Sequence, residues 1–223
     1  MKLFDRLKDA ASESWREYTH HSFVEQMAAG TLPKEAFQTY LVQDYLFLID
    51  FSRAYALAIY KSRNLKQMRS NLLGLKGLLE VEMDLHVRIC ERWGLSPADL
   101  EQTPLETETL AYTSYVLEAG MRGDLLDLKI ALAPCVIGYG EIAERLAEVP
   151  GALAKDNPYA EWISEYAGRE YQELRSHAIA ELDELAPSHI EADQFQRLVT
   201  IFDQATRLET DFWQMGLKRL PTR

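Results

Sequence analysis

The sequence predicts an all-α fold, a bundle of about eight helices around one core. Between helix-breaking residues, apolar side chains recur at spacings of three and four, as in the segment Lys2–Tyr18. Eleven glycines, eight prolines and no convincing alternating apolar pattern leave little material for strands. Since 47% of the 223 residues are hydrophobic, the chain can bury a core without disulfides or metals. We therefore expect one helical domain over residues 1–223.

The first helices follow from their start and stop signals. One helix is expected over Lys2–Tyr18 and a short one over Phe23–Ala28. A long helix is expected over Pro33–Ser62, because proline in the first turn has no N–H to leave unpaired. The next is expected over Leu65–Trp93 and ends at Gly94.

Five more helix starts carry capping signals. Ser96 precedes a proline and an acid in the first turn. Thr103–Glu106 and Ser188–Glu191 have the pattern of a capping box, the first with proline at the first helical position. Asp124 follows Gly123, and Asn157 precedes Pro158. These positions predict the remaining helices.

Charge and composition exclude several classes of partner. The chain has 35 acidic and 24 basic residues, and its net charge of −11 repels nucleic acids and anionic membranes. The longest uncharged apolar stretch, Ile130–Gly140, is far shorter than the roughly 20 residues that a spanning helix needs. The charged N-terminal segment cannot be the apolar region of a signal peptide, and two cysteines are too few for a disulfide framework. We expect a cytoplasmic protein.

Two acidic residues lie on apolar faces of predicted helices. Asp44, in YLVQDYLFLIDF, has apolar neighbours at spacings of three, four and seven, and Glu209 is placed likewise in ATRLETDFWQMG. Burying an unpaired polar group costs on the order of a few kcal/mol. One such acid alone favours a structural pairing with a core arginine or tyrosine, whereas two together favour a functional site.

The segment ALAPCVIGYGEI contains a third anomaly. Pro134 inside a helix predicts a kink, and Cys135 is presented at that kink. Tyr139 follows on the same face, and the glycines on either side of it leave room beside the helix. A reactive thiol and a small core residue are equally compatible with Cys135, whereas Cys90 is expected to be a core residue.

Tyrosines also recur at helical spacing. Tyr112 and Tyr115 lie in one predicted helix, and Tyr159, Trp162 and Tyr166 in another. Such stripes usually belong to a core. Their hydroxyls nevertheless need partners, so several around one cavity would suit a flat polar heterocycle.

Metal and haem chemistry are not favoured. A di-iron bundle uses two Glu-x-x-His motifs, and only Glu17 with His20 has that spacing. A haem pocket needs a proximal histidine, but His20 and His21 are more typical of solvent-facing or capping residues. Two further pairs are four residues apart, which suits a surface pair as well as a site: Glu82 with His86, and Glu173 with His177. We expect no metal and no cofactor.

Four blocks, in the right order over nearly the whole chain, resemble the TenA family, also called thiaminase II. They are WREYTHHSFVEQMAAGTLPKEAFQTYLVQDYLFL, APCVIGYGEIAERL, NPYAEWISEYAG and RLETDFWQMG. Cys135 identifies the cysteine-bearing branch. The resemblance implies a haem-oxygenase-like fold, a homotetramer, and neither haem nor metal. It also implies hydrolysis of 4-amino-5-aminomethyl-2-methylpyrimidine, or of thiamin, to hydroxymethylpyrimidine in thiamin salvage.

The resemblance also implies roles for single residues. Cys135 would be the nucleophile, Glu209 the acid/base near a ring nitrogen, and Asp44 the partner of the exocyclic amine. Phe47 stands where many members have tyrosine, which removes one hydroxyl and bears on rate or substrate preference. Four further side chains would line the pyrimidine pocket: Tyr112, Tyr139, Tyr166 and Phe212.

Three hypotheses follow: an aminopyrimidine hydrolase, a non-enzymatic pyrimidine-binding or regulatory protein on the same scaffold, and a haem or di-iron enzyme of that fold. Cys135 together with Glu209 and Asp44 favours the hydrolase, because a binding protein has no use for a thiol at a kink. An aminomethylpyrimidine, a formylated derivative and thiamin all stay open as substrates. The group that activates the thiol stays open as well.

Overall fold

The computed structural model describes residues 2–218, and those residues form helices without a single strand, so the all-α prediction is confirmed. Two π-helical segments, η1 and η2, each join the α-helices on either side into one continuous run. In chain order the elements are α1 (Leu3–Ala10), α2 (Ser12–Thr19), α3 (Ser22–Ala28), α4 (Lys34–Lys61), α5 (Leu65–Gly77), η1 (Leu78–Glu82), α6 (Met83–Arg92), α7 (Pro97–Gln102), α8 (Thr107–Arg122), α9 (Leu125–Ala133), η2 (Pro134–Gly138), α10 (Tyr139–Ala147), α11 (Ala160–Ala167), α12 (Arg169–Leu185) and α13 (Ala192–Lys218).

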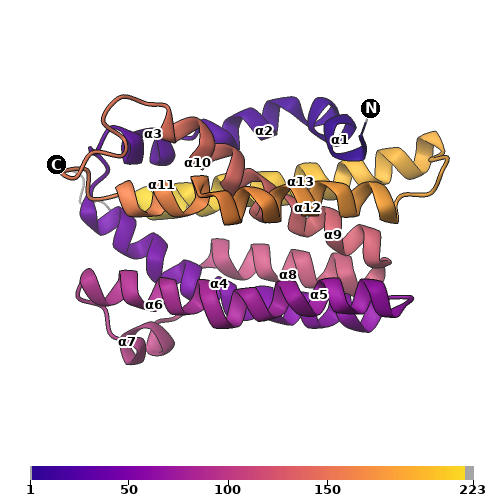
Figure 1. Ribbon diagram of the computed structural model, residues 1–223, viewed down its shortest axis with the longest axis horizontal. Coiled ribbons are helices and arrows are strands. Elements are labelled where there is room, and N and C mark those ends of the chain that lie inside the picture. Colours follow the sequence, from indigo (N-terminus) through magenta and orange to yellow (C-terminus); the bar gives the residue numbers. More distant parts are fainter. Residues whose placement is uncertain (1, 219–223) are drawn as a thin grey trace.

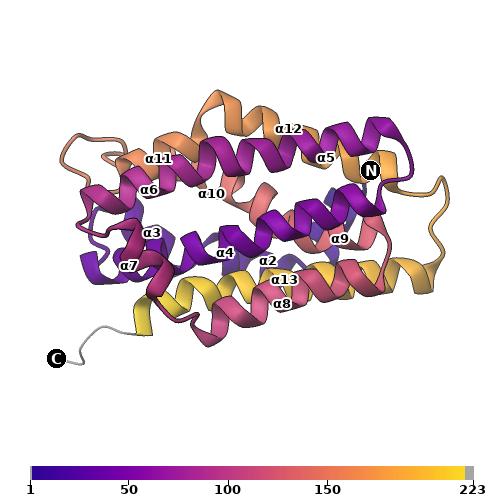
Figure 2. The same cartoon turned by 90° about the horizontal axis from the view of Figure 1, so that it is seen from below.

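The long helices run side by side along the length of the bundle. Figure 1 shows α4, α5, α6 and α8 along one side, α1, α2 and α3 along the other, and α11, α12 and α13 between them. In the view of Figure 2, α13 lies beside α8 at one edge, while α11 and α12 lie beside α6 and α5 at the opposite edge. The middle parts of α4, α8, α13 and the α9–η2–α10 run therefore enclose one interior.

Aromatic side chains fix these helices against one another. Trp213 of α13 is fully buried, and its ring lies 5.1 Å from that of Phe23 in α3 and 5.3 Å from that of Tyr40 in α4. The ring of Tyr139 in α10 lies 5.2 Å away on another side. Each such pair adds packing energy beyond that of the buried area. The core therefore holds the elements that carry polar interior groups in fixed positions.

Two of the predicted caps are confirmed. Ser96 Oγ accepts a hydrogen bond from the N–H of Asp99 at 3.2 Å, and Asp99 Oδ2 accepts one from the N–H of Ser96 at 3.0 Å. Asp124 and Asp127 form the same reciprocal box at the start of α9, both bonds being 3.1 Å. Pro33 is the residue immediately before α4 rather than part of its first turn.

The predicted helix starts at Thr103–Glu106 and Ser188–Glu191 are wrong, because α8 and α13 begin after these segments. Ahead of α8, the buried Gln43 of α4 binds the connecting turn. Its Nε2 donates to the carbonyl of Pro104 at 3.0 Å, and its Oε1 accepts from the N–H of Glu106 at 3.0 Å. A tertiary contact therefore overrides the local capping pattern.

Two other boundaries also differ from the predictions. The helix expected over Lys2–Tyr18 is interrupted at Ala11, whose φ of −112° and ψ of 31° are not helical. Asn157 was expected to cap a helix, but α11 begins only at its third following residue. Its buried amide donates instead to the carbonyls of Met27 at 3.1 Å and Ala152 at 2.9 Å, which ties this turn to the end of α3.

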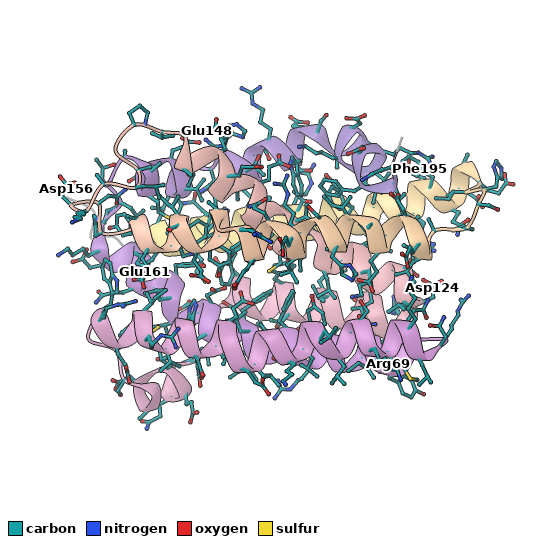
Figure 3. All side chains as sticks on the ribbon, viewed as in Figure 1. Arg69, Asp124, Glu148, Asp156, Glu161 and Phe195 are labelled. Atoms are coloured by element: carbon teal, nitrogen blue, oxygen red, sulfur yellow. The ribbon has the colours of Figure 1, made fainter. Side chains whose placement is uncertain are left out.

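The connections lie at the two ends of the bundle. In Figure 3, Glu148 and Asp156 mark the α10–α11 connection at one end, and Phe195, near the start of α13, lies at the other. Arg69 and Asp124 also lie at the end marked by Phe195. Among the helices of residues 2–218, none combines the length and apolar character needed to cross a bilayer.

The room beside Gly138 is occupied by the ring of Tyr18. A Cβ added at Gly138 would lie 2.4 Å from a carbon of that ring. Tyr18 is fully buried and its hydroxyl donates to the carbonyl of Pro134 at 3.2 Å, so the ring cannot swing away. We expect Gly138→Ala to destabilise the protein by about 1–3 kcal/mol through overpacking, measured by thermal melting.

Gly77→Ala is the matched control. Gly77 ends α5, and an added Cβ there meets nothing within 4 Å. Because alanine favours a helix by up to about 1 kcal/mol over glycine, Gly77→Ala should hold or raise Tm. Equal losses of Tm in the two variants would contradict the steric explanation.

Candidate active site

A cavity of about 480 Å³ lies between the α5–η1 run on one side and η2, α11 and α12 on the other. Its walls include Cys135, Tyr166 and Tyr55, and Glu82 lines it from the η1 side. The exposed residues Leu73, Glu165, Glu170, Leu174 and His177 line it where it meets solvent. A space of this size can accept a small heterocyclic molecule.

Cys135 reaches this cavity from η2. Pro134 has no N–H for the helical ladder, and the chain responds by forming one π-helical turn rather than by breaking the helix. The predicted kink is thus a wider turn inside a continuous helix. Cys135 is partly accessible through the cavity, whereas Cys90 is fully buried in α6, as a core residue should be.

The thiol of Cys135 is protonated in the resting protein. Burial raises its pKa well above the usual value, and the negative charges of Glu209, Glu82 and Asp44 raise it further. A thiol becomes an effective nucleophile only as a thiolate. To act as a nucleophile, Cys135 would therefore need a neighbouring base to take its proton.

Glu209 is the buried acid of α13. Its side chain is 1% exposed, and its Oε1 accepts a hydrogen bond of 2.8 Å from the hydroxyl of Tyr112 in α8. Burial raises the pKa of Glu209 to about 8, although the bond from Tyr112 works against this shift. The group can therefore hold or release a proton near neutral pH.

Asp44 is the buried acid of α4. The hydroxyl of Tyr40 donates to its Oδ2 at 3.0 Å, and His86 Nε2 lies 3.5 Å from the same oxygen. The indole N–H of Trp162 donates in turn to the Tyr40 hydroxyl at 3.0 Å. Burial raises the pKa of Asp44 to about 7 and lowers that of His86 to about 4, so the histidine is neutral.

Aromatic rings connect these polar groups. Phe47 stacks on Tyr112 with a centroid distance of 5.0 Å and contacts Phe212 at 5.8 Å. Tyr139 and Tyr166 meet edge to face at 5.3 Å. The predicted residues are thus gathered in one region, but only Cys135 and Tyr166 of the eight line the cavity itself. The other six are packed in the interior: Asp44, Phe47, Tyr112, Tyr139, Glu209 and Phe212.

Sequence reasoning missed several polar residues of this region. Tyr40 and Trp162 support Asp44 through hydrogen bonds, and the helical spacing of Tyr40 from Asp44 was the available signal. His86 lies beside Asp44, but its Nε2 is hydrogen-bonded to the carbonyl of Leu41 at 2.9 Å. Glu82 lies on the cavity wall and accepts a hydrogen bond from the Tyr166 hydroxyl at 3.4 Å. Glu82 and His86 are therefore interior groups rather than a surface pair.

The histidines weighed for haem have other surroundings. His20 is exposed, and the His21 ring accepts a hydrogen bond from the N–H of Phe23 at 3.2 Å and so caps α3. His177 lies at the cavity mouth, 3.1 Å from Ser70 Oγ. Within residues 2–218, no three His, Cys, Asp or Glu side chains are grouped as a metal would require.

Residues 8–219 match the TENA/THI-4/PQQC family. The chain belongs to this family. It is 41% identical over 217 residues to a Halalkalibacterium halodurans protein named aminopyrimidine aminohydrolase, and the match covers 97% of this chain and 96% of that one. The predicted family is thereby confirmed.

Solved structures agree with this family. A protein of Silicibacter sp. TM1040, described as a TenA family transcription regulator, superposes with a TM-score of 0.91 at 46% identity, over 97% of each chain. A Shewanella denitrificans domain of unknown function with a heme oxygenase-like fold superposes with a TM-score of 0.76 at 11% identity, over 96% of this chain and 92% of that one. The second similarity shows the fold alone and confirms the haem-oxygenase-like bundle.

The buried acid of α13 makes stability depend on pH. Because burial raises the pKa of Glu209 from 4.5 to about 8, the native state keeps a proton that the unfolded chain releases. This contribution to stability is complete below about pH 4.5 and is lost as the pH rises to about 8. In Glu209→Gln the titration is absent, while an amide oxygen can still accept from Tyr112. We therefore expect the Tm of the variant, relative to wild type, to increase between pH 5 and pH 8. A difference in Tm that is the same at both pH values would contradict the raised pKa.

Proposed function

We propose that this chain hydrolyses a 4-amino-2-methylpyrimidine at its 5-methylene group by covalent catalysis through Cys135. The observation that carries the proposal is the thiol on the cavity wall, with buried acids beside it whose pKa values lie near neutrality. Relatives named aminopyrimidine aminohydrolase, at up to 41% identity, confirm the prediction of an enzyme and support a hydrolase of thiamin salvage.

Glu209 would transfer the proton while the thiol attacks the ring. As the sulfur of Cys135 bonds to an electron-poor ring carbon, the Glu209 carboxylate takes the thiol proton and passes it to a ring nitrogen. The substituent then leaves the methylene, water adds there, and the thiol departs as the ring is restored. Glu209 supports this role because burial holds its pKa at about 8, and because its charge is the largest electrostatic influence on the thiol.

Asp44 and the aromatic residues would bind the pyrimidine. Asp44 has an oxygen available beside the one that Tyr40 and His86 contact, and it would accept from the exocyclic amine of the substrate. Four side chains would pack around the ring: Tyr112, Tyr139, Tyr166 and Phe212. Phe47 brings no hydroxyl to this network, so its effect would be on rate or substrate preference.

A regulatory role is the second candidate, because one close structural relative is described as a transcription regulator. The two roles differ in what they need from the site. A binding protein needs the acids and the aromatic rings, but not a thiol on the cavity wall. The net charge of −11 also disfavours direct contact with DNA. The hydrolase is therefore preferred.

The state of the protein in the cell is part of the proposal. We infer one domain, a cytoplasmic location and a homotetramer. Exposed apolar side chains support the last point: Leu65, Met68 and Leu72 follow one another at spacings of three and four on the outer face of α5, and each is at least 37% exposed. Such a stripe is typical of a surface that another subunit covers.

Replacing the thiol tests the covalent mechanism. Cys135→Ser should abolish turnover of aminomethylpyrimidine and of thiamin, because the hydroxyl is a far weaker nucleophile at neutral pH, while the fold and the binding of hydroxymethylpyrimidine persist. Cys90→Ser is the matched control and should keep nearly full turnover per folded molecule. Turnover at the wild-type rate in Cys135→Ser would remove the covalent mechanism.

Asp44→Asn tests the recognition of the amine. An amide loses the charge-assisted part of the hydrogen bond, worth on the order of 1.5–3 kcal/mol, so binding should weaken by about 10- to 100-fold. Calorimetry with hydroxymethylpyrimidine measures this, and a pyrimidine without the exocyclic amine should bind wild type poorly. If wild type binds the two pyrimidines equally, Asp44 does not recognise the amine.

A further inference from the structure

Glu82 is a third acid of this region, half-buried on the cavity wall, and the mechanism above does not use it. It is the last residue of η1, on the wall of the cavity that also contains Cys135. The hydroxyl of Tyr166 donates to its Oε1 at 3.4 Å. In the described part of the chain Glu82 makes no ion pair, whereas the cavity lysine, Lys129, is already bound to Glu181 at 2.9 Å. Glu82 is therefore not held there by a salt bridge.

The groups that face Glu82 come from several elements. The charges of Asp44 in α4 and Glu165 in α11 raise the pKa of Glu82. The charge of Glu82 in turn raises the pKa values of Cys135 in η2 and Tyr171 in α12. Burial and then the charge of Asp44 raise the pKa of Glu82 to about 8, against the bond from Tyr166. The carboxyl group is therefore mostly protonated at neutral pH and can exchange its proton there.

The position of Glu82 differs from that of the other two acids. Asp44 and Glu209 are packed in the interior, on the helices that would hold the pyrimidine ring, whereas Glu82 lines the open cavity. The cavity offers a substituent on the ring's methylene group room beside Cys135 and Glu82. We propose that Glu82 is the acid/base group for the leaving substituent and for the water that replaces it. The inference rests on the proposed function.

Glu82 would donate one proton in the first step and take one up in the second. When the carbon–nitrogen bond of an aminomethyl substrate breaks, its electron pair stays with nitrogen, and the Glu82 carboxyl gives its proton to that nitrogen, so ammonia leaves. The resulting carboxylate then takes a proton from water as the water oxygen bonds to the methylene carbon. Hydroxymethylpyrimidine forms and Glu82 is protonated again. One carboxyl group serves both steps.

Thiamin as the substrate distinguishes the departure of the substituent from the addition of water. Its thiazolium nitrogen takes the electron pair of the breaking bond and leaves as a neutral thiazole, so departure needs no proton. The addition of water still needs a base, which is the ionised form of Glu82, and Glu82 afterwards releases the proton to solvent. In Glu82→Gln, we expect turnover of aminomethylpyrimidine to fall by roughly 10²–10⁴-fold, the usual contribution of a general acid or base. With thiamin, the same variant should release one equivalent of thiazole rapidly and then turn over slowly.

Glu80→Gln is the matched control, because it removes a carboxylate from the exposed face of the same η1 segment, outside the residues that line the cavity. It should show neither the loss of turnover nor the burst. In a second variant, Glu82→Ala, added formate should restore turnover in proportion to its concentration, because a small carboxylic acid can enter the space left in the cavity. Circular dichroism and Tm show that each variant is folded.

The outcomes are distinct. A burst with thiamin in Glu82→Gln, or rescue of Glu82→Ala by formate, supports the role of Glu82. Wild-type turnover in folded Glu82→Gln, or equal slowing of thiazole release and of turnover without formate rescue, overturns it. Absence of hydrolysis of both substrates by wild type would instead overturn the proposed function itself.

Discussion

The burial of carboxyl groups inside a helical bundle is the constraint on which the site depends. Desolvation raises the pKa of Asp44 to about 7 and that of Glu209 to about 8. At a protein surface both would be charged at neutral pH and would be poor proton donors. Here each can be neutral or charged, and the hydrogen bonds from Tyr40 and Tyr112 keep either form from being unpaired. Burial therefore gives each acid the protonation range that a proton-transfer role would need.

Tyrosine suits this interior because its ring packs while its hydroxyl binds. Tyr112 stacks on Phe47 and donates to Glu209. Tyr40 packs against Trp213 and donates to Asp44. The same side chains therefore fix the helices and orient the acids, so the fold and the site share their contacts. A change in one of these rings would alter packing and the hydrogen bond to an acid together.

The acids could be found from the sequence because an acid among apolar residues at helical spacing is a local signal, and Asp44 and Glu209 both have it. Contacts between distant segments leave no such signal. Gln43 displaces the start of α8 through two bonds across more than sixty residues. Glu82 was compatible with a surface pair because the cavity around it is completed by α11 and α12, which come from far along the chain. Local patterns thus identified the acids on helices with a clear apolar face, and tertiary packing decided the rest.

The two π-helical turns carry an acid and a thiol that line the cavity. A π-helical turn contains an additional residue, which rotates the following side chains relative to a regular helix, and such turns are frequent at functional sites. η2 carries Cys135 and η1 ends at Glu82, and both residues line the same cavity from different helical runs. Pro134 explains one of these turns, since its missing N–H breaks the α-helical ladder. The η1 segment has no proline, so its geometry must come from packing against α4 and the flanking helices. Cys135, the proposed nucleophile, is therefore placed by local sequence, and Glu82, the acid that faces it across the cavity, by tertiary structure. This is why only Cys135 could be recognised before the fold was known.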